Sequence, residues 1–331
     1  MGMKRLFLYL LLIAPLFGQS TPITSITTQT TTIGATSYGG ATFNGLNRAV
    51  MTMADSSGNN YTIAGTSTDV FLRRNTGAGN SNNTSVTFAS AGTPNTFLGP
   101  YATTTQTVLL GNNIYQSIDN VFANGTTVST GNIERVDYLF NGSAGLVATS
   151  LDALAIFERG LVGQHDSFNV SLITGWDSLT NTPTSFTRIT TVSTLNFGPS
   201  NVTVDGVANY TYGYNLFRYN TGDNLTNWTA NNETSSQGIG GVILNWLGLG
   251  ANSGQTIYGY SIAANDTTTT RNRFDNYDNS NWFPTNSTNG FDPFGANGQV
   301  WRHYTPVPEP STYGAIFVAL MLGVIVWKRK R

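Results

Sequence analysis

The chain has 331 residues, no cysteine, a charged fraction of 10% and a formal net charge of −1. The lack of cysteine excludes disulfides, lipid attachment at a cysteine and cysteine-based zinc sites. Six of the 16 Lys and Arg residues lie at the two ends, so the body between them has no lysine and is net acidic, which argues against nucleic-acid binding.

Residues 1–20 have the pattern of a secretory signal peptide. Lys4 and Arg5 precede an apolar run over residues 6–17, and the small residues Gly18 and Ser20 follow it. The run is shorter than the ~20 apolar residues of a membrane span, so we expect a signal peptidase to cleave after Gly18 or Ser20. An uncleaved N-terminal anchor is the alternative.

Residues 21–305 are expected to form one β-rich extracellular domain. The aromatic content of 12% is too high for a disordered stalk. Short segments of alternating apolar and polar residues are separated by Gly and Asn clusters, as in strands and turns. The clearest are 48–53, 133–140, 168–172, 188–194, 210–216 and 258–262. Residues 239–249 are the one segment expected to hold a short helical turn. We therefore predict an all-β fold, an antiparallel β-sandwich or jelly roll.

Two Glu-Arg pairs lie in the middle of the chain, Glu134-Arg135 and Glu158-Arg159. The two glutamates could be the acid and the base of a glycoside hydrolase. The alternative is an ion network in which each Arg binds a carboxylate, which would lower the pKa of the glutamates, the wrong direction for a general acid. We favour the network and predict no catalytic residue.

The consecutive residues His165, Asp166 and Ser167 do not predict a catalytic triad, because neighbouring residues of a strand point to opposite faces of the sheet. No cofactor and no metal site is predicted from the histidines. Asp275 and Asp278 are a weak candidate for Ca²⁺ binding, since their segment lacks the Gly and the final Glu of a standard calcium loop. An Asx-rich turn is the alternative.

Trp228 and Trp282 lie in Asn-rich segments that read as loops. An exposed indole ring in a loop can stack on a sugar, so these two residues are the candidates for glycan binding. A place in the hydrophobic core is the commoner role for Trp and is the alternative.

The last 26 residues, 306–331, combine three signals in a fixed order. Val307, Pro308, Glu309 and Pro310 form an extended segment, because proline cannot enter a helix interior and disfavours helix in the residue before it. Residues 312–327 are expected to form a transmembrane helix. Lys328, Arg329, Lys330 and Arg331 follow it, and their positive charge places this end in the cytoplasm and the N-terminus outside.

This order resembles the PEP-CTERM sorting signal of bacterial surface proteins, whose namesake motif matches Pro308-Glu309-Pro310. The resemblance implies that an exosortase-type membrane transpeptidase recognises the tail, cleaves near the motif and passes the protein to the cell surface or the extracellular matrix. An unprocessed tail anchor is the alternative.

The sequence therefore predicts an exported, C-terminally sorted surface or matrix protein with a structural or adhesive role and no enzymatic activity. Its expected partners are a signal peptidase, the exosortase-type protease, the membrane and an extracellular polysaccharide. A carbohydrate-binding module that uses the loop aromatics is the first alternative, and a secreted polysaccharide hydrolase is the second.

Overall fold

Strands make up most of the regular structure in this computed structural model. It describes residues 20–32, 36–38, 41–43, 46–74, 109–114, 116–118, 121–122, 133–208, 214–218, 229–233, 238–269, 274, 276–277, 279–284, 287 and 289–304. The predicted signal peptide and the sorting segment lie outside these residues. Within them, no helix is long and apolar enough to cross a membrane.

Six antiparallel strands close into a barrel-like ring, because each pairs with the next and the last pairs with the first. In ring order they are β1 (Thr21–Thr32), β4 (Leu46–Asp55), β5 (Asn60–Arg74), β19 (Gln299–Tyr304), β9 (Asp152–Gly160) and β16 (Gly238–Asn245). The short β13 (Thr203–Val204) runs parallel to β1 at the side of the ring.

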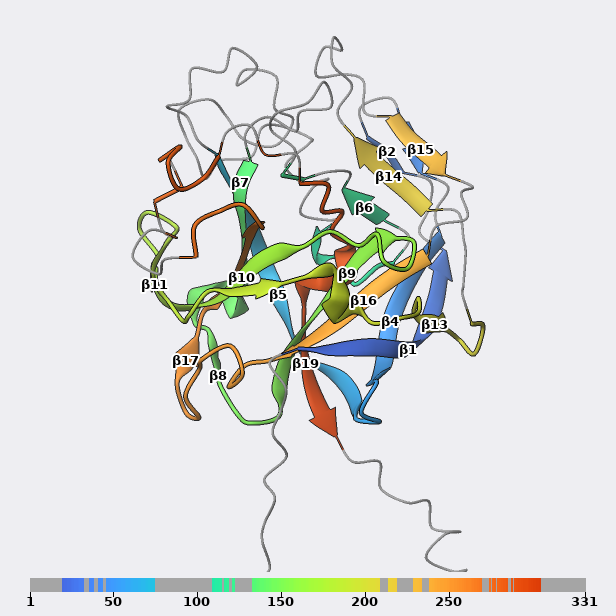
Figure 1. Cartoon of the computed structure of the whole chain (residues 1–331), viewed down its shortest axis with the longest axis horizontal. Helices are drawn as coiled ribbons and strands as arrows, with labels where there is room; N and C mark the ends of the chain where they lie inside the picture. Colours follow the sequence, from blue (N-terminus) through green and yellow to red (C-terminus); the bar gives the residue numbers. More distant parts are fainter. Residues whose placement is uncertain are drawn as a thin grey trace, which may run out of the picture.

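A second group of strands continues the sheet from the far half of β5. Residues 60–66 of β5 pair with β19, whereas residues 67–74 pair with β7, so this one strand belongs to both groups. Beyond β5 the antiparallel order is β7 (Ile133–Phe140), β18 (Gly259–Ala264), β10 (Phe168–Asp177) and then β11 (Thr182–Phe186) and β12 (Thr190–Val192), which both pair with β10. In Figure 1, β10 and β11 lie to the left, β1 and β4 to the right, and β9 and β16 between them.

The remaining described elements are short. Three small sheets are formed by β2 (Thr36–Tyr38) with β3 (Ala41–Phe43), by β6 (Gln116–Ile118) with β14 (Tyr214–Arg218) and β15 (Thr229–Glu233), and by β8 (Leu146–Val147) with β17 (Thr256–Ile257). Three 3₁₀ turns are η2 (Asn141–Ser143), η3 (Thr194–Phe197) and η4 (Gly295–Gly298).

Strands β9 and β16 are buried on both faces, which explains their nearly continuous apolar sequences. Leu154 and Ile156 point to one side, into a cluster shared with β5, β7, β10 and β18. Ala155 and Phe157 point to the other side, into a cluster with residues of all six ring strands. Because strand side chains alternate between faces, these two strands form the layer between the two hydrophobic cores.

The antiparallel all-β architecture predicted from the sequence is confirmed. The helical turn expected over residues 239–249 is wrong for most of that segment, since residues 238–245 form β16, and turns begin at Trp246. The glycines there allow close packing. A Cβ atom on Gly240 would lie 2.5 Å from the ring of His165, and one on Gly241 would lie 2.8 Å from Ile23.

Candidate functional site

A buried ion cluster lies on the face of β5, β7 and β18 that is turned away from the hydrophobic cluster of Val136, Tyr138 and Ile262. Asp137 is fully buried and accepts hydrogen bonds from Arg73, Arg135 and the hydroxyl of Ser261, at 2.6–3.0 Å. Burial alone would raise the pKa of Asp137, but the two guanidinium groups outweigh it and hold the pKa below its usual value. The other donors of the cluster serve Asp137 or backbone carbonyls, whereas Nη1 of Arg73 is buried without a hydrogen-bond partner among the described residues.

Aromatic rings cover this cluster. The Arg73 guanidinium lies 5.1 Å from the ring centre of Phe71, and that of Arg135 lies 5.1 Å from Phe186 and 5.3 Å from Tyr277. Such cation–π contacts offset part of the cost of burying two cations.

A second buried pair joins β9 to the loop after it. Glu158 is fully buried, and its Oε2 lies 2.8 Å from Nδ1 of His165. Burial, together with the charges of Asp292 and Asp166, raises the pKa of Glu158 well above its usual value, and burial lowers the pKa of His165 to about 4. Both directions favour a neutral pair, in which the protonated carboxyl donates to the ring nitrogen.

The ion network predicted from the two Glu-Arg pairs exists, because each of the two arginines binds a carboxylate. Arg135 binds Asp137, and Arg159 binds Asp292 at 2.6 Å. The predicted lowering of the pKa of Glu158 is therefore wrong, because Arg159 is committed to Asp292 and burial dominates at Glu158.

The raised pKa of Glu158 has the direction that a general acid requires. However, Glu134 is on β7 and Glu158 is on β9, and β5 and β19 lie between these strands in the sheet order. The two glutamates are therefore not cross-strand neighbours, and Glu158 is enclosed rather than open to a substrate. His165 contacts Glu158, and the ring of Phe197 lies 4.8 Å from that of His165.

Of the other predicted site residues, the structure describes Trp282 only. Trp282 is half-buried and packs against a small cluster that contains Phe274 and Phe283. Trp228, Asp275, Asp278, the motif Val307, Pro308, Glu309 and Pro310, and the basic residues Lys328, Arg329, Lys330 and Arg331 lie outside the described residues. Among the described part of the chain, no group of three or more His, Asp or Glu residues has the geometry to hold a metal ion.

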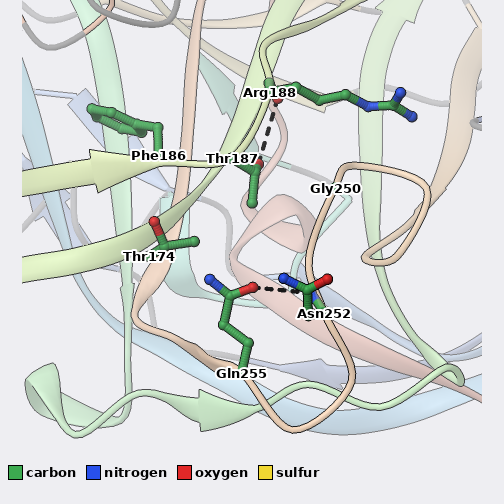
Figure 2. Close-up of a pocket in the computed structure, with 7 residues that line it drawn as sticks. All are labelled: Thr174, Phe186, Thr187, Arg188, Gly250, Asn252 and Gln255. Carbon is green, nitrogen blue, oxygen red and sulfur yellow. Dashed lines mark hydrogen bonds between the residues drawn. The ribbon is translucent and has the colours of Figure 1, made fainter.

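A surface cavity of about 280 Å³ lies where β10 and β11 meet the loop between β16 and β17. Figure 2 shows the residues that line it, which are Thr174, Phe186, Thr187, Arg188, Gly250, Asn252 and Gln255. The lining combines hydroxyl and amide groups with one guanidinium group and one aromatic ring, and it contains no carboxylate. This composition suits a small polar ligand.

Sequence reasoning missed this cavity, because its residues come from three separate segments. The one indication of the cavity in the sequence is Arg188, which has no acidic residue within ten positions on either side.

Comparisons of the chain with protein-family models, with curated proteins and with solved structures give no match.

Proposed function

We propose that this chain is an exported surface or matrix protein with a non-catalytic structural or adhesive role, whose tail an exosortase-type transpeptidase processes. The observation that carries the proposal is the order of the proline motif at 307–310, the apolar run at 312–327 and the four cations at 328–331. The antiparallel body is consistent with exported cargo, because it is held by burial and backbone pairing and needs no disulfide.

The body also supports the finer prediction of sandwich-like layers as part of this proposal. The strands β5, β7, β10 and β18 share one hydrophobic cluster with β9 and β16, and many cell-surface domains are built from sheets packed face to face.

The sorting proposal is tested by the intact mass of the surface-exposed form in the native host. We expect a mass without Lys328, Arg329, Lys330 and Arg331. The double variant Pro308→Ala/Pro310→Ala should stay in the membrane at the mass of the unprocessed tail, because the protease loses its extended recognition segment. Pro306→Ala, just before the motif, is the matched control and should be processed normally. A wild-type surface form that keeps the four cations contradicts the proposal.

The hydrolase alternative predicts that purified protein cleaves a polysaccharide and that Glu158→Gln abolishes the cleavage. We do not favour it, because the Glu158 side chain is fully buried against His165. The carbohydrate-binding alternative has its structural basis in the surface cavity near Arg188 rather than in the loop tryptophans.

A further inference from the structure

The cavity shown in Figure 2 has the size of a site for one small ring. Its volume of about 280 Å³ lies just below the ~300–1,000 Å³ of pockets that hold drug-sized ligands. Phe186 is 2% exposed and its ring packs against Arg135 and Phe274, whereas Thr174, Asn252 and Gln255 bring hydroxyl and amide groups to the lining. Several hydroxyl and amide groups around one small cavity match the hydroxyl groups of a sugar ring.

The amide of Gln255 is held in a fixed orientation. Its Oε1 accepts a hydrogen bond of 2.9 Å from the backbone N–H of Asn252. The amide nitrogen therefore points the other way, and Figure 2 shows it directed toward Thr174. The Thr174 hydroxyl is itself paired with the hydroxyl of Ser185 at 2.9 Å. A donor that is oriented before binding costs less conformational entropy when a ligand arrives.

The positive charge of Arg188 at the rim of the cavity has no described carboxylate as its partner. Arginine side chains elsewhere in the described structure pair with a carboxylate at 2.6–3.6 Å, and these are Arg48, Arg73, Arg135, Arg159 and Arg302. Arg188 is exposed and instead donates to the backbone carbonyl of Gly248. No described carboxylate makes an ion pair with it. Among the arginines whose side chains the structure describes, Arg188 is the one that makes no ion pair with a described carboxylate.

Arg188 has further N–H groups that can donate hydrogen bonds to a ligand. A guanidinium group carries five N–H donors, and the contact with Gly248 uses one of them. In Figure 2 the side chain extends past Gly250 at the rim, away from Thr174. A ligand in the cavity would therefore meet the amide and hydroxyl groups at one end and the positive charge at the other.

We propose that this cavity binds an acidic sugar residue, with the hydroxyls on Gln255, Asn252 and Thr174 and the carboxylate on Arg188. The ligand class is a hexuronate, either free or within a polysaccharide. Carboxylates form bidentate, charge-assisted hydrogen bonds with guanidinium groups, which gives the site its preference for acidic over neutral sugars. The proposal does not depend on tail processing, so it can fail while the sorting proposal holds, and the reverse.

The test is calorimetric titration of the full-length protein, kept in a detergent without a sugar headgroup. The probes are glucuronate, galacturonate, an oligogalacturonate, and glucose and galactose as neutral counterparts. We expect the uronates to bind and the neutral sugars to bind at least tenfold more weakly. Uronate affinity should fall with added salt, because the contact is ionic and partly exposed.

Two variants separate the roles of the residues. Arg188→Gln should lose about tenfold or more of the uronate affinity and keep the weak affinity for neutral sugars, because it removes only the charged hydrogen bonds. Gln255→Ala should weaken uronates and neutral sugars alike. Arg48→Gln, which removes the same charge from β4, is the matched control and should bind as the wild type does. Circular dichroism spectra that match the wild type show that each variant is folded.

The proposal is wrong if no uronate binds or if the wild type binds acidic and neutral sugars equally. It is also wrong if Arg188→Gln keeps the uronate affinity of the wild type. Binding of a sulfated sugar in preference to the uronates would refute the carboxylate assignment. Binding of the oligogalacturonate without the monosaccharides places the ligand within a polymer and supports the proposal.

Discussion

Asp137 binds two guanidinium groups in the interior of the protein. Its replacement tests how much this ion cluster contributes to the free energy of unfolding. Asp137→Asn keeps the size of the side chain but leaves Arg73 and Arg135 buried without a counter-charge. Breaking a buried pair in this way costs about 3–5 kcal/mol of unfolding free energy. Urea denaturation measures the cost.

The control for Asp137→Asn is Asp205→Asn, which disrupts the partly exposed pair with Arg48 at 3.6 Å. We expect a loss of about 1 kcal/mol or less there, because solvent screens exposed ion pairs. Equal losses in the two variants would contradict the structural role of the Asp137 cluster. Because the pKa of Asp137 is lowered, its contribution is present above about pH 4 and is lost as the pH falls further.

The Glu158–His165 pair predicts a stability plateau between pH 4.5 and 6.5, the pKa values that the two groups have in the unfolded chain. The raised pKa of Glu158 gives a contribution to stability that is complete below pH 4.5 and is lost as the pH rises through the folded-state pKa. The lowered pKa of His165 gives a second contribution to stability, which is complete above pH 6.5 and is lost as the pH falls toward about 4. Between the two values the slopes cancel, because both states hold one proton on the pair.

Glu158→Gln tests this pH dependence, since its amide can still donate to His165. The variant should lose the fall in stability above pH 6.5 and should begin to lose stability below pH 6.5 instead of below 4.5. Urea denaturation of both proteins from pH 4 to 9 gives the difference. An alkaline slope that is the same in both would mean that Glu158 is ionised in the fold.

The strand pattern explains which residue contacts could be predicted from the sequence. Side chains two positions apart share a face of a strand, so Arg135 and Asp137 meet, whereas Glu134 and Arg135 point to opposite faces. This two-residue period by itself predicts Asp137 as the partner of Arg135. The partner of Arg159 could not be predicted, because Asp292 is far along the chain and reaches it only through the tertiary fold.

At the scale of elements, β16 depends on glycine for its fit against β9 and the loop that holds His165. Gly240→Ala places a methyl group 2.5 Å from the His165 ring, and overpacking of this kind costs about 1–3 kcal/mol. The double variant Gly240→Ala/His165→Ala removes the clash. Its unfolding free energy, measured in urea, should fall by less than the sum of the two single losses. Additive losses would show that the ring and the glycine do not compete for the same space.

The same glycines explain why the sequence misled at residues 239–249. Five glycines among thirteen residues obscure the two-residue period of a strand, and the apolar residues lie on both faces because both faces are buried. The segments 133–140 and 168–172 were predicted correctly as strands, since β-branched and aromatic residues recur there at every second position. Ring closure could not be predicted, because it joins β1 to β16 and β5 to β19 over long sequence separations.

At the scale of the whole molecule, the shared layer of β9 and β16 couples the two hydrophobic cores. Ile156 belongs to one core and Phe157 to the other, although they are neighbours in the chain. We expect one cooperative thermal transition, and Ile156→Ala and Phe157→Ala should each lower its midpoint, with losses of about 2–5 kcal/mol. Differential scanning calorimetry tests this. Two transitions, each shifted by one variant only, would show that the cores unfold independently.

The position of β19 bears on how the protein would withstand tension. β19 is the last strand among the described residues, and it is hydrogen-bonded to β5 on one side and to β9 on the other. If the chain is tethered through its C-terminal side, a pull enters the body at Tyr304 and must break two rows of hydrogen bonds rather than peel away a single outer strand. The tether point is thereby among the parts of the described sheet that are hardest to pull loose.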